Sequence, residues 1–463
     1  MRTLPHITAL VLSVAMAVHA QESRTHADFR GEAERFKQSC GAFDVKNIFS
    51  CAELLFTDHP LHIAVGSLAP QNGFGAGAAL VGNWTPNESW RTSWDTDAVG
   101  TENGSWRAGF YFKAIHTPVE HISVITTTSG PPPRSNLAVH PYTVFNAYAQ
   151  SISLDQVFYY GLGQNSRQSN ATVFGMRETI AGVSAIVPLP HLRFVSLLGE
   201  MNGRFVDVHG NHHESSPSIE RIFTDSTAPG LAAQPAFAQF GEGARIEPTL
   251  FGDRFQLDYL AQFQQFVAPG SQNSFRRFTA DLGHTIPLYR NTGSYGPKTT
   301  NGPDECAAAV GATKCPSVER NRYGSIGARL LIVESVASAG NTVPFYLDPT
   351  LGGSDVNGNS WLPSYNDYRF RAPNAIVVRG SFEHSIWGPI GAAFNYDQGK
   401  VALARDDIDF SHMAHSFAAG LTVRAGGLPA LSLSFAWAGP ESTHTIATVN
   451  NSLLGGSARP SLF

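Results

Sequence analysis

Apolar and polar residues alternate with a period of two in segment after segment of this chain, from His62 onward. The clearest run spans residues 254–266. Its apolar set is Phe255, Leu257, Tyr259, Ala261 and Phe263, and its polar set is Arg254, Gln256, Asp258, Gln262 and Gln264. Successive side chains of a β-strand point to opposite faces, so the pattern predicts strands with one apolar and one polar face. After residue 20 no apolar run is long enough for a membrane-spanning helix, which nearly excludes a helical membrane protein.

Sixteen segments follow this pattern, and each is long enough to cross an outer membrane as a tilted strand. They are 62–70, 73–85, 89–98, 104–116, 142–154, 171–188, 192–209, 236–249, 254–268, 274–287, 323–337, 374–388, 391–403, 411–425, 429–438 and 442–450. The early segments alternate less clearly, so counts of 14 or 12 stay open.

Composition points to the same fold class. Hydrophobic residues make up 42 % of the chain and charged residues 15 %, while glycine (44) and phenylalanine (30) are abundant. This mixture suits a sheet with lipid outside and water inside better than a solid core. We therefore predict an all-β fold, a transmembrane antiparallel β-barrel over residues 61–463. A net charge of −5 offers no basic face, so nucleic acid is not expected as a partner.

The first 60 residues differ from the rest. Residues 1–20 combine an early arginine, an apolar run and a small-residue cleavage site, which predicts a cleaved signal peptide and export to the outer membrane of a Gram-negative type envelope. Residues 21–60 have loose helical periodicity, and we expect a plug or cap there. Cys40 and Cys51 could form a disulfide only if a helix breaks between them, near Gly41; the alternative is a disordered leader with two free thiols.

Connections between the predicted strands alternate between tight and long, as between periplasmic turns and surface loops. The long ones include 117–141, 155–170, 210–235 and 338–373. The stretch 290–322 falls on the side of the tight turns, where its length is unexpected. Cys306 and Cys315 are candidates for a second disulfide inside it.

Residues 343–402 contain the inward charges that we rank highest. Arg379 and Glu383 share one face of a predicted strand, and Asp397 lies on the same face of the next. Charges at alternate positions fit a wet interior better than a dry core. The plain interpretation is a generic polar lumen; the functional one is a docking site for the preceding long loop.

Motifs in this region resemble the barrel domain of the bacterial surface antigen superfamily of outer-membrane proteins, the group that includes BamA, TamA and two-partner secretion transporters. The matching pieces are Pro344-Phe345-Tyr346, Leu351-Gly352-Gly353, Tyr368-Arg369-Phe370-Arg371 and Tyr396-Asp397-Gln398-Gly399. The resemblance implies that the long loop folds back into the barrel. It also implies that an arginine of an Arg-Gly-aromatic tip contacts the strand with the Asp-x-Gly motif. Residues 21–60 are too few for one periplasmic POTRA domain of that family.

The chain departs from the family at the loop tip, where it reads Leu362-Pro363-Ser364-Tyr365 without the arginine and the glycine. Arg369 and Arg371 follow within reach of an extended chain. We hypothesise that one of them, Arg371 by preference, pairs with Asp397 and Glu383.

Other candidate chemistry is weaker. His209, His212, His213 and Glu214 are dense in a loop but lack the helical spacing of zinc proteases, so no metal is predicted. A Gly-x-Ser-x-Gly elbow is missing from the sequence, and Asp406, Asp407 and Asp409 fit a wet hairpin tip better than a calcium site. We expect neither an enzyme nor a cofactor.

The leading functional hypothesis is an outer-membrane barrel for protein or lipid transport or insertion, as the resemblance implies. The alternatives are a passive pore or a structural barrel without cargo and, more remotely, an outer-membrane hydrolase. The expected partners are outer-membrane lipid and a periplasmic or exported protein, with the barrel itself a monomer.

Overall fold

The chain is all-β in the part that the structure, a computed structural model, describes. The described residues are 61–116, 142–192, 194–211, 216–251, 254–295, 318–387, 390–425, 428–437, 444–449 and 460. Among them, none forms a helix long and apolar enough to cross a membrane. The predicted signal peptide, the segment 21–60, all four cysteines and residues 212–214 lie outside the described residues.

One antiparallel sheet of 17 strands contains nearly all of the described strands, and apart from the short β9 each member pairs with its neighbours in chain order. They are β1 (Leu61–Ser67), β2 (Phe74–Asn87), β3 (Trp90–Thr101), β4 (Trp106–His116), β5 (Thr143–Tyr159), β6 (Thr172–Pro188), β7 (Val195–Gly210), β8 (Phe237–Ile246), β9 (Thr249–Leu250), β10 (Phe255–Val267), β11 (Phe275–Tyr295), β12 (Val318–Ala337), β15 (Asn374–Trp387), β16 (Ile390–Ala402), β17 (Ala414–Ala425), β18 (Leu428–Trp437) and β19 (His444–Val449). The short β9 continues β8 alongside β10. The other strands correspond one for one to the sixteen predicted segments.

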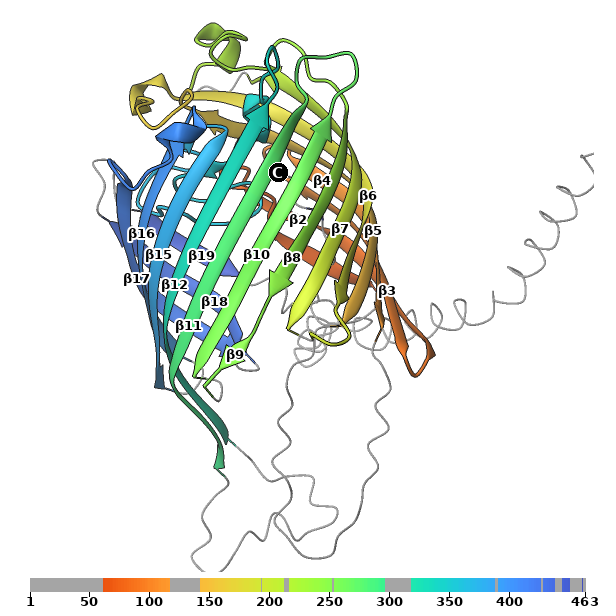
Figure 1. Cartoon of the computed structure of the whole chain (residues 1–463), viewed down its shortest axis with the longest axis vertical. Helices are drawn as coiled ribbons and strands as arrows, with labels where there is room; N and C mark the ends of the chain where they lie inside the picture. The colour runs from red at the N-terminus through yellow and green to blue at the C-terminus, as the bar shows by residue number, and fades with distance from the viewer. Residues whose placement is uncertain are drawn as a thin grey trace, which may run out of the picture.

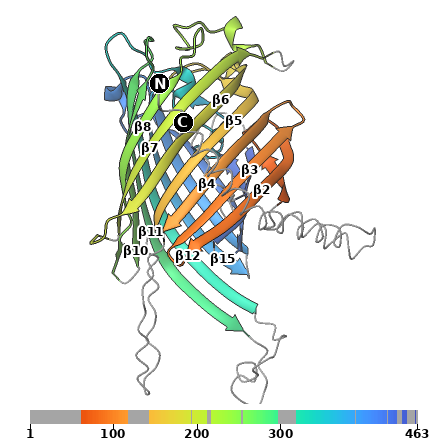
Figure 2. The ribbon, with the colours of Figure 1, turned by 90° about the vertical axis from the view of Figure 1, so that its right-hand side faces the viewer.

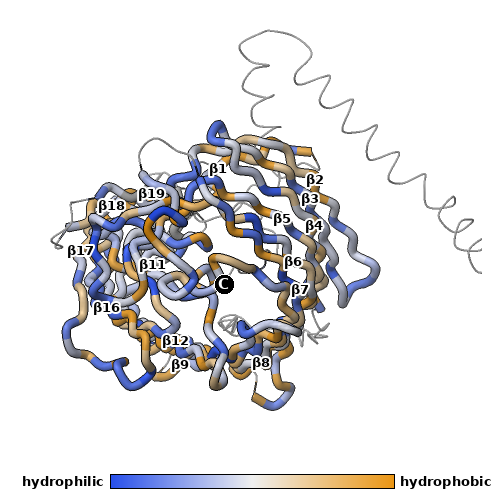
Figure 3. The backbone as a smooth tube through the Cα atoms, turned by 90° about the horizontal axis from the view of Figure 1, so that it is seen from above, coloured by the Kyte–Doolittle hydropathy of each residue, from blue (hydrophilic) through white to orange (hydrophobic). Residues whose placement is uncertain are grey.

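The sheet curls around a lumen (Figures 1 and 3). Seen from above, β2 to β7 form one side of the ring and β16 to β18 the opposite side (Figure 3). Within the described residues no ladder of hydrogen bonds joins β19 to β1, so the curled sheet ends in two edges.

Side chains alternate between the two faces of the wall as the sequence pattern predicts for β10. Phe263 points outward and is 37 % exposed, whereas its neighbour Gln264 points inward, is buried and donates to Glu200 of β7 at 2.6 Å. The same alternation exposes large apolar side chains around the wall, including Met201, Phe205, Phe240, Phe382, Leu433 and Phe435. The outer face is therefore largely apolar, and the inner face is polar except where the wall forms a buried apolar cluster.

The two ends of the wall differ. One end, the turn end, has the tight connections between β2 and β3, β6 and β7, and β15 and β16. The other, the loop end, has the long connections 160–171, 211–236 and 338–373. At the turn end β11 and β12 extend beyond the neighbouring strands (Figure 2). The placement of 117–141 among the long surface loops is wrong. The strand ends that flank it, His116 and Thr143, lie at the turn end, because β4 and β5 are antiparallel.

Candidate functional site

The connection 338–373, which we call the inner loop, is the most deeply buried loop of the described chain. It contains η3 (Phe345–Leu347) and a small two-stranded sheet of β13 (Thr350–Leu351) and β14 (Phe370–Arg371). Its buried residues include Phe345, Tyr346, Leu347, Leu351, Trp361, Leu362, Tyr365, Tyr368 and Phe370. A loop with this many buried side chains is part of the core, so the inner loop fills part of the lumen.

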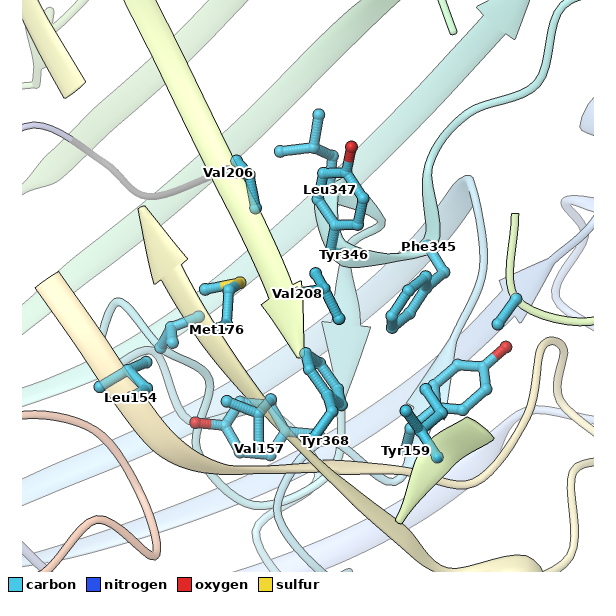
Figure 4. Close-up of a cluster of buried hydrophobic side chains, with 14 of the residues drawn as sticks. Leu154, Val157, Tyr159, Met176, Val206, Val208, Phe345, Tyr346, Leu347 and Tyr368 are labelled. Atoms are coloured by element: carbon cyan, nitrogen blue, oxygen red, sulfur yellow. The ribbon is translucent and has the colours of Figure 1, made fainter. Parts of the chain in front are cut away.

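Aromatic packing fixes the first part of the inner loop. The Phe345 ring lies 5.0 Å from Tyr159 of β5 and 5.2 Å from Phe174 of β6, measured between ring centroids. Tyr346 and Leu347 belong to the same buried cluster as Val206 and Val208 of β7 (Figure 4). Fully burying a side chain of this kind contributes about 1.5–3 kcal/mol, so this cluster alone holds the loop firmly against the wall.

An ion pair in the wall holds the tip of the inner loop, residues 360–365. Arg379 of β15 lies directly opposite Asp397 of β16 in the ladder. Arg379 Nε donates to Asp397 Oδ1 at 2.7 Å and Nη2 donates to Oδ2 at 2.6 Å, and the Asp397 side chain is fully buried. The backbone N–H of Leu362 donates to the same Oδ2 at 3.0 Å. The Asp397 carboxylate thus binds both Arg379 of the wall and Leu362 of the loop tip.

Trp361 adds a second contact at the tip. Its ring lies beneath two guanidinium groups, with 4.3 Å from Arg379 Cζ and 4.9 Å from Arg329 Cζ to the ring centroid. Arg379 also donates to the backbone carbonyl of Ser360. Cation–π contacts of this geometry contribute roughly 0.5–2 kcal/mol each. Arg329 itself is held by Asp281 of β11, at 2.7 Å from Nε to Oδ1.

Close packing around Gly399 explains why a glycine stands two residues after Asp397. A Cβ at this position would lie 3.0 Å from Leu351 Cδ1 and 3.2 Å from Leu362 Cδ1. Leu362 has a φ of 52°, in the left-handed region, so its backbone has little freedom to move away. The glycine therefore leaves space for the two leucines that dock beside Asp397.

Two glycines shape the inner loop before its tip. Gly352 and Gly353 both have positive φ, of 104° and 56°. A Cβ on Gly352 would lie 2.5 Å from the Cβ of Arg369, and one on Gly353 would collide with Asp367.

At the tip itself, Ser364 is fully buried and its backbone N–H donates to Ser416 Oγ of β17 at 2.9 Å. Tyr365 packs on Phe370 with its ring 5.1 Å away.

The hypothesis that Arg371 pairs with Asp397 and Glu383 is wrong. Arg371 is buried and its Nη1 donates to the Phe345 carbonyl at 2.9 Å. The Asp397 carboxylate is instead paired with Arg379, which lies directly opposite it on the adjacent strand. Glu383 accepts a hydrogen bond from Thr422 at 3.4 Å instead.

Arg369 also has other partners than the predicted ones. Its guanidinium donates to Ser166 Oγ at 2.8 Å and to the Ser166 carbonyl at 2.7 Å, and it lies 5.2 Å from the centroid of the Tyr160 ring. Arg369 thus ties the inner loop to the loop between β5 and β6.

Arg329, Trp361 and Ser416 were missed by the sequence reasoning. For the main pair the sequence indicated only that Arg379 and Asp397 share the inward face. Counting from the tight turn does not pair them, because an irregularity between Ser385 and Trp387 shifts the register by one residue.

No metal centre forms in the described part of the chain, where no group of three or more His, Cys, Asp or Glu side chains could hold an ion. His209, the described member of the predicted histidine-rich loop, lies on β7 beside Gly175.

Comparisons of this chain with known proteins find similarity in structure only. No protein-family model matches it, and no curated protein matches it. Its structure is similar to that of BamA from Haemophilus ducreyi lacking POTRA domains 1-3, with a TM-score of 0.48 and 9 % identity over 84 % of this chain and 69 % of that chain. It is also similar to CdiB from Escherichia coli, with a TM-score of 0.47 and 11 % identity over 84 % of this chain and 62 % of that one. For CdiB from Acinetobacter baumannii the TM-score is 0.43 and the identity 11 %, over 81 % and 56 %. The chain thus spans less than two thirds of both CdiB chains.

Proposed function

We propose that this protein is an integral outer-membrane β-barrel whose lumen is closed by the inner loop until that loop is released. The membrane assignment is supported by the outer face of the wall. Its apolar side chains are bounded at the loop end by a row of rings, Tyr396, Phe417 and Trp437, with 4.7 and 6.0 Å between neighbouring centroids. At the turn end, Trp84 and Trp387 are 57 % and 71 % exposed. Aromatic residues at both borders of an apolar band are typical of barrels that span a membrane.

The proposal rests on one observation: the Asp397 carboxylate accepts hydrogen bonds from both Arg379 and the Leu362 N–H. The carboxylate is buried, and its partners come from the wall and from the loop tip. Removing either partner leaves a buried charge partly unsatisfied, which is costly. The inner loop is therefore a fixed part of the resting barrel, which favours a closed barrel over a passive pore.

We propose transport or insertion of protein or lipid as the activity, rather than catalysis. The sequence motifs support this, since they resemble a superfamily with such roles. A plugged lumen also suits a barrel that opens only for cargo. In the same proposal, residues 21–60 cap the barrel from the turn end, where β1 begins.

Conductance across planar lipid bilayers tests the closed state. We expect the wild-type protein to stay silent or to flicker briefly, and Asp397→Asn to open often, because the neutral amide no longer balances Arg379. The matched control is Asp258→Asn. Asp258 pairs with Arg245 on the inner face at 2.8 Å, and among the described residues neither side chain is hydrogen-bonded to the inner loop.

Two outcomes count against the proposal. Steady, large wild-type channels would mean a passive pore. An Asp397→Asn protein as closed as the wild type would mean that this carboxylate does not hold the loop.

A further inference from the structure

Glu242 of β8 has its side chain on the outer face of the wall. On this strand Gln239 and Arg245 point inward, where Gln239 donates to Glu200 at 2.9 Å and Arg245 to Asp258. Phe240 is on the opposite, outward face and is 47 % exposed. Glu242 is two residues from Phe240, so it shares the outward face, and it is exposed there.

The register places this carboxylate inside the apolar band. Glu242 lies opposite Gly199 of β7 and opposite Phe263 of β10. On β7 the outward apolar side chains run from Leu197 to Phe205. Gly199 is two residues from Leu197 and six from Phe205, and on β8 itself Glu242 lies between the outward apolar residues Phe240 and Ile246, so the carboxylate is inside the band.

A shallow hollow surrounds the carboxylate. Leu197, Ala261, Phe263 and Phe278 line it together with Glu242. Beside it, nothing lies within 4 Å of the place where a Cβ of Gly199 would be. Glu242 is exposed, so a side chain from outside could reach the carboxylate.

Glu242 has no hydrogen bond or ion pair with any described residue. The outward neighbours on the two flanking strands are glycine and phenylalanine. An isolated carboxylate in hydrocarbon is costly, and ionisable residues inside a membrane normally have a partner.

We propose that Glu242 and this hollow form a docking surface for a membrane-embedded segment of another protein, one that brings a lysine or arginine side chain into the apolar band. The inference rests on the proposed membrane location. A second copy of this chain is the other possible source of a cation, since Arg276 of β11 is exposed on the outward face two residues from Phe278, and the test below separates the two occupants. Lipid fits poorly, because cationic headgroups remain at the borders of the band. Charge complementarity thus selects a basic partner segment.

A designed peptide tests the proposal without knowledge of the natural partner. The full chain is placed in phosphatidylcholine bilayers with a labelled Leu/Ala helix of about 20 residues, long enough to span. One peptide has a central lysine and its twin a central leucine. Energy transfer from a label on the barrel reports association. We expect the lysine peptide to bind the wild-type protein about tenfold more tightly than its twin. We also expect this preference to disappear in Glu242→Leu and to fall in Glu242→Gln.

Glu334→Gln is the matched control. Glu334 is an outward carboxylate near the loop end that already pairs with Arg405 at 2.9 Å, so this variant should keep the full preference. Equal binding of both peptides to the wild type, or an unchanged preference in Glu242→Leu, would overturn the proposal. Self-association of the wild type that is lost in Glu242→Leu would instead assign the surface to a second copy and contradict a different partner protein.

Insertion is checked first, by a change of electrophoretic mobility on heating. A protein that does not insert contradicts the proposed function. An inserted protein without the lysine preference contradicts only the present inference.

Discussion

Asp397 shows how one residue can serve the wall and the loop together. The motif resemblance implies an arginine on the loop tip, yet the chain has Pro363 there. The positive charge comes from Arg379 on the neighbouring strand, and the loop contributes only a backbone N–H, from Leu362. The bidentate pair is strong and directional, so the carboxylate is already oriented when the tip arrives.

The sequence predicted that Arg379 and Asp397 point inward, and the structure brings them together. It did not predict the destinations of Arg369 and Arg371, because a loop without periodicity has no register from which to count. The path of such a loop is fixed by buried contacts between residues far apart in the chain, such as Phe345 with Tyr159.

At the same scale, Asp348 gives a prediction about pH. Its buried carboxyl lies near Arg277 and Arg371, and burial raises its pKa well above the usual range although both arginines oppose the shift. A carboxyl whose pKa is higher in the folded state stabilises that state most below its unfolded pKa of about 3.9. This contribution is lost as the pH rises toward the raised value.

We therefore expect the urea midpoint of unfolding to fall with rising pH above about 4, and to fall less steeply in Asp348→Asn. Each unit of pKa difference corresponds to about 1.4 kcal/mol. Asp406→Asn, in the exposed η4 (Arg405–Asp407), should keep the wild-type slope. Equal slopes in all three proteins would mean that Asp348 does not cause the pH dependence of stability.

At the scale of elements, the strands were the most predictable part of the fold, because each one repeats the same two-residue period. Element ends were less predictable: β5 continues to Tyr159 and β11 to Tyr295, both beyond the predicted limits. Such extensions depend on the partner strand, which the local pattern does not contain.

Two neighbouring residues of β10 test the assignment of faces. Phe263→Arg places a charge in the outward band and should cost roughly 2–4 kcal/mol. Gln262→Arg places the same charge inside, near the Glu200 carboxylate that Gln262 now contacts at 3.1 Å, and should be tolerated. The measurement is the free energy of unfolding from lipid vesicles in urea. If both variants were equally stable, the register of β10 would be shifted by one residue.

At the scale of the whole molecule, three features fit one barrel architecture: the apolar outer face, the largely polar inner face and the buried inner loop. In the proposed barrel the curled sheet separates lipid from lumen, and the loop occupies part of the lumen from the loop end. Composition and alternation predicted the separation of the faces. The extent to which the loop fills the lumen depends on packing between distant elements, which the sequence does not reveal.

Closure of the sheet is the remaining step of the proposed barrel. A closed barrel must lose many ladder hydrogen bonds together, so the protein should resist SDS at room temperature and unfold on boiling. A gel band whose mobility is the same before and after heating would speak against closure.

A disulfide between the loop tip and the wall tests the central claim most directly. The Ser364 backbone N–H lies 2.9 Å from Ser416 Oγ, which places the two residues within reach of a disulfide. The experiment uses Ser364→Cys and Ser416→Cys in a chain whose Cys40, Cys51, Cys306 and Cys315 are changed to serine. We predict that mild oxidation of the folded, heat-modifiable protein joins the two new cysteines and blocks maleimide labelling of both. If both thiols stay reduced and react freely with maleimide while the protein is folded, the inner loop is not docked where this account places it.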